Sequence, residues 1–496
     1  MKKKSLPSKL NKLSQYWKKQ LSTFDDAAVI RLFKIFSLAA TLAICYATVF
    51  SGLQIVDEYE HLHASWLVSI GQVPYRDFLE HHHPLLWYLS APILSVFYDK
   101  VIVFYVMRVI SAAASMLMTY YIYKLVLFFG DKKCAWLAVC LYLGHVITLY
   151  TFYQFRPDTF MNLSFVMGIY YLFLSLKQNS LKPLIFSFLG FTFAFLFLQK
   201  IALLLMVVEA ILVVLIFIKK LKIKHVIYAA IPSVGAVLAV LLFFFIKGAL
   251  LEFIEFNYHF NQIMLSYYER GNFWYPHIFL SLYGLALLVS IYFYKKENIY
   301  FKIAAILCVA EFLMRAFYFA PYTHYYSTLT ICSAIVLAVL AKKMMPKHKI
   351  FSILFILLMF IGLGDAFNRV DYNATTRNSY YYYQMADFVH KNSKPDDMLM
   401  NGYDMNFNIY RPDVSYYWFQ LELLLPIFEK EYNFSHKLDI NALILQYRPK
   451  FIYAKDFVDL KAMRTYGETK YTQKFIPELL RTFYEPTSFK YLMMLK

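Results

Sequence analysis

Long apolar runs, separated by short polar loops, occupy most of the chain. A helix of about 20 apolar residues crosses the ~30 Å hydrocarbon core of a bilayer. The run 84–98 is shorter and would extend only about 22 Å as a helix, so we expect it to be interfacial or re-entrant. The remaining runs predict roughly eleven spanning helices, at about 31–53, 101–129, 134–152, 159–176, 184–198, 201–218, 225–246, 276–294, 303–319, 326–341 and 350–364.

The pattern changes after about residue 365. Residues 382–391 are helix-like and precede Pro and Asp turn signals and the strand-like residues 398–400. Residues 441–447 are also helix-like and precede a second strand-like run at 450–454. This alternation of helix, turn and strand predicts a small α/β domain over residues 365–496.

Composition excludes several classes of protein. The chain is 60% hydrophobic and only 17% charged, whereas about a quarter of a soluble domain is charged. A soluble enzyme and a disordered chain are therefore excluded. The net charge of +18 does not indicate nucleic-acid binding, because membrane proteins gather Lys and Arg in cytoplasmic loops. The five cysteines all lie in apolar runs, so neither a disulfide framework nor a cysteine zinc site is predicted.

The distribution of charge predicts the orientation. Residues 1–30 are basic and lack the apolar stretch of a signal peptide, so we expect a cytoplasmic leader. If 84–98 does not cross, the most basic loops share the leader's side, as the positive-inside rule favours. The transmembrane domain is then 31–364, and the regions outside are the first external loop (54–100), a second loop (247–275) and the domain at 365–496.

Acids and histidines are densest in the first external loop. Asp57 and Glu58 directly follow the first predicted span. The simplest explanation is that they cap an interfacial helix, because carboxylates favour helix N-termini. The alternative is catalysis. Adjacent helical side chains point about 100° apart, so the two cannot flank one bond as a glycosidase pair does. One base, Asp57, and a separate role for Glu58 fit better.

The histidines of this loop raise the alternative of a metal site. Imidazole and carboxylate together can bind zinc or manganese. However, consecutive histidines cannot all face one ion, and the chain has no HExxH or CxxC spacing. We therefore expect no metal and no other cofactor, with a divalent metal as the alternative, and side chains that face a phosphate instead. The histidines are His61, His63, His81, His82 and His83.

Further candidates lie at the ends of the predicted spans. Lys200 is notable because it is the only charge between two short apolar helices. Glu311 and Arg315 are four residues apart in one span, where a functional site and a structural ion pair are equally good explanations; Arg108 and Glu209 are equally open. The other candidates on the external face are Arg156, Asp158, His259, Glu269, Arg270, His324 and Tyr325.

An Asp-Glu pair just after the first span resembles the signature of the GT-C membrane glycosyltransferases. The likeness is strongest to the bacterial protein O-mannosyltransferase and aminoarabinose-transferase type. The stretch VDEYEHLHASWLVSIGQVPYRDFLEHHHPLLWYL at 56–89 is similar to the first loop of their bacterial relatives. Matches follow at Arg108, 156–158, Lys200 and 324–325, so the resemblance covers about 31–365; an external C-terminal domain is also usual.

The resemblance implies an all-α polytopic membrane protein that carries a small external α/β domain. It implies a polyprenyl-phosphate sugar donor, a hydroxyl acceptor on a lipid, glycan or protein, and inverting transfer on the non-cytoplasmic face of a bacterial inner membrane. Asp57 would be the base and Glu58 its partner. The donor phosphate would be faced by Lys200, His324, Tyr325, Arg270, His82 and His83, with Arg108, Asp158 and His61 in support. Histidines stand where the aminoarabinose transferases have Glu-Lys before Pro84, so the donor's identity does not transfer.

The chemistry of such a transfer fits this set of side chains. A phosphate with a second pKa of about 6 leaves as a stable anion, so cations and one base suffice. A transporter or lipid flippase is the competing class. It would place ionisable residues near the bilayer midplane and show paired broken helices and a repeat, whereas here the densest polar cluster lies at the external boundary and no repeat is visible. A ligase that moves a whole oligosaccharide stays open as the alternative within the enzyme class.

Overall fold

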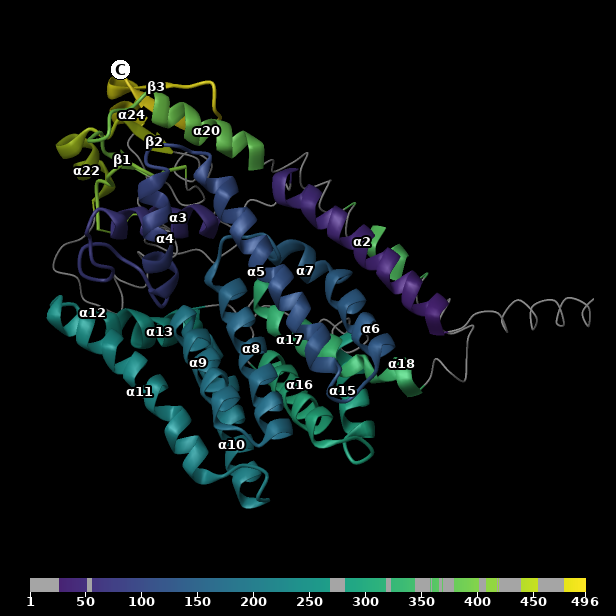
Figure 1. Ribbon diagram of the computed structural model, residues 1–496. Coiled ribbons are helices and arrows are strands. Elements are labelled where there is room, and N and C mark those ends of the chain that lie inside the picture. The colour runs from purple at the N-terminus through teal and green to yellow at the C-terminus, as the bar shows by residue number, and fades with distance from the viewer. Residues whose placement is uncertain are drawn as a thin grey trace, which may run out of the picture.

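The computed structural model consists of a large helical bundle and a small C-terminal sheet (Figure 1). The residues that the structure describes are 26–50, 56–267, 282–317, 323–343, 357, 359–364, 368, 379–400, 407–416, 418, 439–453 and 477–496. The combination of a helical membrane part with a small α/β domain confirms the predicted fold class.

Six segments within these ranges are long and apolar enough to cross a membrane. They are the main part of α2 (Asp26–Phe50), all of α5 (Val103–Val126), α8 (Pro157–Gln178) and α11 (Ile223–Ile246), η1 (Gln199–Ile201) with α10 (Ala202–Phe217), and most of η3 (Thr323–Tyr326) with α17 (Ser327–Leu337) and α18 (Val339–Lys343).

The other predicted runs appear as shorter or more polar helices. They are α9 (Leu181–Phe197), α15 (Leu282–Phe293) and α16 (Ile299–Phe317). The run 134–152 is divided into α6 (Lys132–Leu143) and α7 (Val146–Thr151), where Nδ1 of His145 accepts the backbone N–H of Ile147 and caps the second helix. Residues 276–281 and most of 350–364 lie outside the described residues.

The first external loop forms two helices that pack against each other, α3 (Val56–Ser69) and α4 (Leu85–Val96). Both lie at the end of the bundle that faces the C-terminal sheet (Figure 1). Twelve residues in α4 extend about 18 Å, well short of the ~30 Å core. The length agrees with the prediction that 84–98 does not cross. The second loop begins with α12 (Leu250–Ile254), η2 (Glu255–His259) and α13 (Phe260–Tyr267).

The C-terminal domain is a four-stranded sheet in the order β1-β2-β4-β3, with helices beside it. β1 and β2 are parallel, and the other two pairings are antiparallel. The predicted helix–strand alternation is present here. The elements are α20 (Ser379–Lys391), β1 (Leu399–Met400), α22 (Ile440–Tyr447), β2 (Phe451–Tyr453), α24 (Pro477–Phe483), β3 (Tyr484–Pro486) and β4 (Leu492–Leu495).

Residues 407–416 and Trp418 attach this domain to the first external loop. Nε2 of His63 lies 2.5 Å from Oδ2 of Asp413. The indole N–H of Trp418 donates to the carbonyl of Leu79 at 3.1 Å. The loop is thus held between the bundle and the C-terminal domain, and these contacts fix the position of α3, which carries Asp57.

Candidate functional site

The two adjacent acids at the start of α3 have different partners. Glu58 is fully buried and forms a bidentate ion pair with Arg108 of α5, at 2.9 and 2.5 Å. It also accepts the backbone N–H of Phe155 at 3.2 Å. Two well-aligned bonds between Arg and carboxylate hold α3 against α5. This arrangement makes Glu58 an anchor of the helix.

Asp57 belongs to a second, more open network. Its carboxylate forms an ion pair with Arg156. The Arg156 guanidinium also contacts Asp158 at 3.3 Å and donates to Nε2 of His324 at 3.0 Å. Asp158 in turn forms an ion pair with Lys200. Charged side chains from α3, the start of α8 and η1 therefore form one continuous chain of contacts.

Local backbone structure places these groups. Arg156 is the extended N-cap residue of α8, with Pro157 at the first helical position and Asp158 in the first turn. Lys200 lies in η1, the short connection between α9 and α10. Its ammonium is 4.4 Å from the ring centroid of Tyr325 in η3, a cation–π contact. Each group thus sits where one helix ends or begins.

Exposure distinguishes the ends of this network from its middle. The side chains of Asp57 and Lys200 are 20% and 21% exposed, whereas those of Arg156 and Asp158 are 4% and 5% exposed. A substrate can therefore reach one carboxylate and one ammonium, and the buried Arg156–Asp158 pair fixes the spacing between them.

A second polar cluster lies on α3 and the turn before α4. It consists of Glu60, His61, Glu80 and His82, of which only His82 is partly exposed. Burial, together with the charge of Glu80, raises the pKa of Glu60. Burial also lowers the pKa of His61. The sequence places Glu60 and Glu80 in its densest polar stretch, but we did not single them out as candidates, although Glu60 lies three residues after Asp57 on one helical face.

Two further predicted residues, His83 and Arg270, are not part of either cluster as the structure describes them. His83 donates from Nδ1 to the carbonyl of Phe195 at 2.7 Å, and its Nε2 accepts from the Tyr258 hydroxyl at 3.1 Å. Burial lowers the pKa of His83 to about 4, so it is neutral near pH 7. It joins the loop to α9 and η2. Arg270 lies outside the described residues.

The structure brings together six of the residues singled out in the sequence: Asp57, Arg156, Asp158, Lys200, His324 and Tyr325. It places Glu58 with Arg108 in the sealed ion pair, and His61 with His82 in the second cluster. Arg156 is the connecting residue. The sequence marked it as a candidate through its position before Pro157, but gave no sign of its partners.

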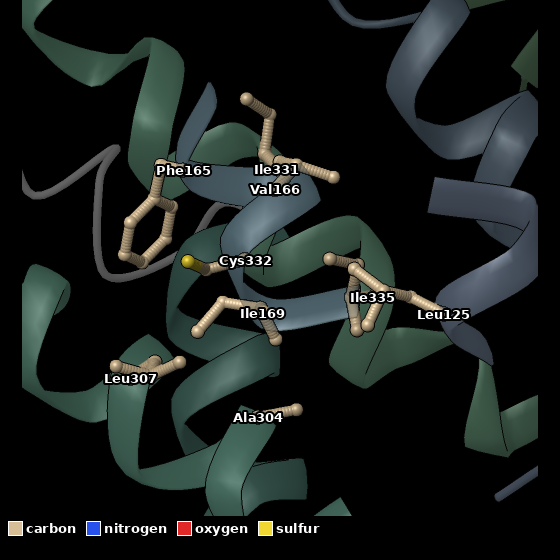
Figure 2. A pocket seen from close by; sticks show the side chains of 9 residues that line it. All are labelled: Leu125, Phe165, Val166, Ile169, Ala304, Leu307, Ile331, Cys332 and Ile335. Atoms are coloured by element: carbon tan, nitrogen blue, oxygen red, sulfur yellow. The ribbon is translucent and has the colours of Figure 1, made fainter. Parts of the chain in front are cut away.

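Two small cavities lie deeper in the bundle. One, of about 20 Å³, is lined by nine apolar side chains from α5, α8, α16 and α17 (Figure 2). The other, of about 10 Å³, lies under the network and includes Asp158, Asn162 and Ser327 in its lining. These volumes are near that of a single water molecule, so both are packing voids, too small for a sugar.

Comparison with known proteins identifies the fold. Residues 81–246, a third of the chain, match the family model described as dolichyl-phosphate-mannose-protein mannosyltransferase. The matched region contains Arg108, Asp158 and Lys200, and begins after Asp57. No curated protein sequence matches the chain.

Three solved structures have the same fold. ArnT from Cupriavidus metallidurans bound to undecaprenyl phosphate is similar with a TM-score of 0.62 at 11% identity, over 86% of this chain and 94% of that one. The apo form of ArnT is similar with a TM-score of 0.56 at 11% identity, over 76% of this chain and 84% of that one. An oligosaccharyltransferase from Archaeoglobus fulgidus, tethered to an acceptor peptide, is similar with a TM-score of 0.51 at 12% identity. The match covers 93% of this chain and 73% of that one. The chain is an integral membrane protein with the fold of the GT-C glycosyltransferases.

Proposed function

We propose that the protein transfers a sugar from a polyprenyl-phosphate donor to a hydroxyl group of a lipid, glycan or protein, with inversion at the anomeric carbon. The observation that carries the proposal is the network from Asp57 to Lys200, which exposes a carboxylate at one end and an ammonium at the other. These are the two groups that such a transfer needs. The fold shared with ArnT, which was crystallised with undecaprenyl phosphate, supports this choice of donor.

The reaction assigns one role to each end of the network. The Asp57 carboxylate accepts the proton of the acceptor hydroxyl, and the hydroxyl oxygen attacks the anomeric carbon from the face opposite the phosphate. The bond between the anomeric carbon and the phosphate oxygen breaks, and polyprenyl phosphate leaves as an anion. Lys200 stabilises that anion. His324 belongs to the same network through its contact with Arg156. Arg156 orients Asp57, and Asp158 orients Lys200.

The direct test uses the purified full-length protein with polyprenyl-phosphate monosaccharides and candidate acceptors. We expect release of polyprenyl phosphate together with stoichiometric appearance of the sugar on an acceptor. The second candidate is an oligosaccharide ligase, which the similarity to the archaeal oligosaccharyltransferase over 93% of this chain supports. Release of the lipid carrier only from a polyprenyl-diphosphate oligosaccharide would favour that ligase. If the protein moved the intact lipid-linked sugar from one leaflet of a liposome to the other without cleaving it, the protein would be a flippase and the proposal would be wrong.

We also propose that the first external loop and the C-terminal domain face the non-cytoplasmic side of a bacterial inner membrane. The basic loops at the opposite ends of the helices support this orientation. In a variant without native cysteines, Lys100→Cys should react with an impermeant thiol reagent added outside. Lys222→Cys should be protected until the membrane is opened. The reverse result would invert the orientation.

A further inference from the structure

We propose that Glu60, Glu80 and His82 bind a divalent metal ion of the zinc or manganese class, with His61 beside the open coordination position. Each of these four residues has a nitrogen or oxygen atom of the kind that can bind a metal, and these atoms all lie within 4.8 Å of one another.

The cluster holds buried polar atoms without partners. Glu60 is fully buried, and among the residues that the structure describes neither of its carboxylate oxygens has a hydrogen-bond partner. The same holds for Oε1 of Glu80 and Nε2 of His61 within the described ranges. Burying a carboxylate without compensation is costly. A divalent cation would compensate both carboxylates at once.

The distances fit ligands that surround one ion. Nδ1 of His82 lies 3.5 Å from Oε1 of Glu60 and 3.3 Å from Oε2 of Glu80. Both distances exceed the range of strong hydrogen bonds. Ligands about 2.1 Å from a tetrahedral zinc ion are separated by about 3.4 Å. The two distances from Nδ1 of His82, of which the shorter is a weak hydrogen bond, therefore match the separation of neighbouring ligands around such an ion.

Hydrogen bonding assigns His61 a different role. The indole N–H of Trp87 donates to Nδ1 of His61 at 3.2 Å. In the neutral ring Nε2 then carries the proton, and a protonated nitrogen cannot bind a metal. We infer that Nε2–H of His61 holds the water or hydroxide in the fourth position. Three protein ligands with one open position are typical of an accessible zinc site, and the 16% exposure of His82 gives the ion a route to solvent.

The ligand set selects the metal class. Imidazole with carboxylates suits zinc and manganese, whereas calcium and magnesium prefer oxygen ligands alone. The sequence did not predict the site because the run of three histidines cannot face one ion. The structure uses only His82 of that run and adds Glu60 and Glu80, which lie twenty residues apart in the chain.

The test is metal binding by the full-length protein, stripped with a chelator and then reloaded. After desalting, we expect one zinc ion per chain by elemental analysis, and a tetrahedral visible spectrum when Co²⁺ replaces zinc. His82→Ala and Glu60→Gln should each weaken zinc binding at least about 100-fold and abolish the Co²⁺ spectrum. The matched control is His259→Ala, which removes an exposed histidine 2.6 Å from Glu255, and it should bind zinc as the wild type does.

Each other outcome counts against the site. Wild-type protein that retains no zinc, or His82→Ala protein that retains it with the same affinity, would overturn the proposal. Equal losses in His82→Ala and His259→Ala would assign the zinc to surface histidines. Circular dichroism checks folding, and because His82 is partly exposed, His82→Ala decides the result if Glu60→Gln fails to fold.

Discussion

Asp57 and Glu58 are neighbours on one helix, yet they belong to opposite kinds of environment. Glu58 forms a sealed ion pair with Arg108, and both side chains are at most 1% exposed. Asp57 starts an open network whose two ends, at Asp57 and Lys200, are about one-fifth exposed. The hundred-degree step between adjacent helical positions separates the two environments.

The difference teaches how a membrane enzyme can place a reactive acid. A sealed ion pair cannot meet a substrate, but it fixes the rotation of α3 about its own axis. That rotation determines where Asp57 points. We therefore interpret Glu58 as a positioning residue and reserve the catalytic role for Asp57, and the following experiments test that division.

The largest effect on activity is expected from Asp57→Asn. The amide keeps the shape of the side chain but cannot accept a proton, so transfer should fall about 10²–10⁴-fold. The thermal midpoint should change little, because Asp57 is one-fifth exposed and the buried Arg156 keeps Asp158 as its counter-charge. Transfer rates and thermal midpoints are compared with those of Asp77→Asn, an exposed acid of the same loop that pairs with Arg76. Full activity in folded Asp57→Asn protein would exclude it as the base.

Glu58→Gln should act chiefly on stability. It leaves the Arg108 guanidinium buried without its counter-charge, which typically lowers the free energy of unfolding by about 3–5 kcal/mol. The double variant Glu58→Gln/Arg108→Met should recover part of that loss, because it removes the uncompensated charge. Thermal unfolding in detergent measures both variants. If Glu58→Gln lost activity at full stability, the division between the two acids would fail.

Lys200→Ala should weaken the other end of the open network. A charged hydrogen bond contributes about 1.5–3 kcal/mol, so kcat/KM for the donor should fall roughly ten- to a hundredfold. Lys200→Arg should keep part of the activity, since it retains the charge. Lys247→Ala is the control, because it removes an exposed lysine from the end of α11. A wild-type rate in Lys200→Ala would reduce Lys200 to a partner of Asp158.

The smallest effect concerns the contact between the loop and the C-terminal domain. Hydrogen bonds from His390 and then Arg411 lower the pKa of Asp99 to about 2. The folded-state pKa is thus below the unfolded value of about 4, so the stabilisation is complete above pH 4 and is lost as the pH falls towards 2. Asp99→Asn should lower the thermal midpoint at pH 7 and match the wild type near pH 2. If the thermal midpoints of Asp99→Asn and the wild type differed by the same amount at pH 2 and pH 7, the stabilising role of ionised Asp99 would be contradicted.

The sequence predicted the positions of the helices and strands better than the contacts between distant side chains. Apolar runs located most helices because each must cover about 30 Å of lipid, and the helix–strand alternation located the C-terminal sheet. Asp57, Lys200 and His324 were predictable because each lies next to the end of an apolar run. The Glu58–Arg108 pair joins residues fifty positions apart, and no local pattern encodes such a distance. The meeting of Glu60 with Glu80 and His82, about twenty positions away, is likewise not encoded by a local pattern.

The attachment of residues 407–416 and Trp418 to the first external loop limits which parts of this fold can be exchanged between proteins. Asp413 meets His63, Trp418 meets Leu79 and Arg411 meets Asp99, so three partners of the C-terminal domain lie in the loop that begins with the candidate base. A chimera that exchanged only the C-terminal domain with a relative would break all three contacts. Residues 57–100 and the C-terminal domain are therefore coupled in structure, and exchanging one of them requires a partner that can remake these contacts.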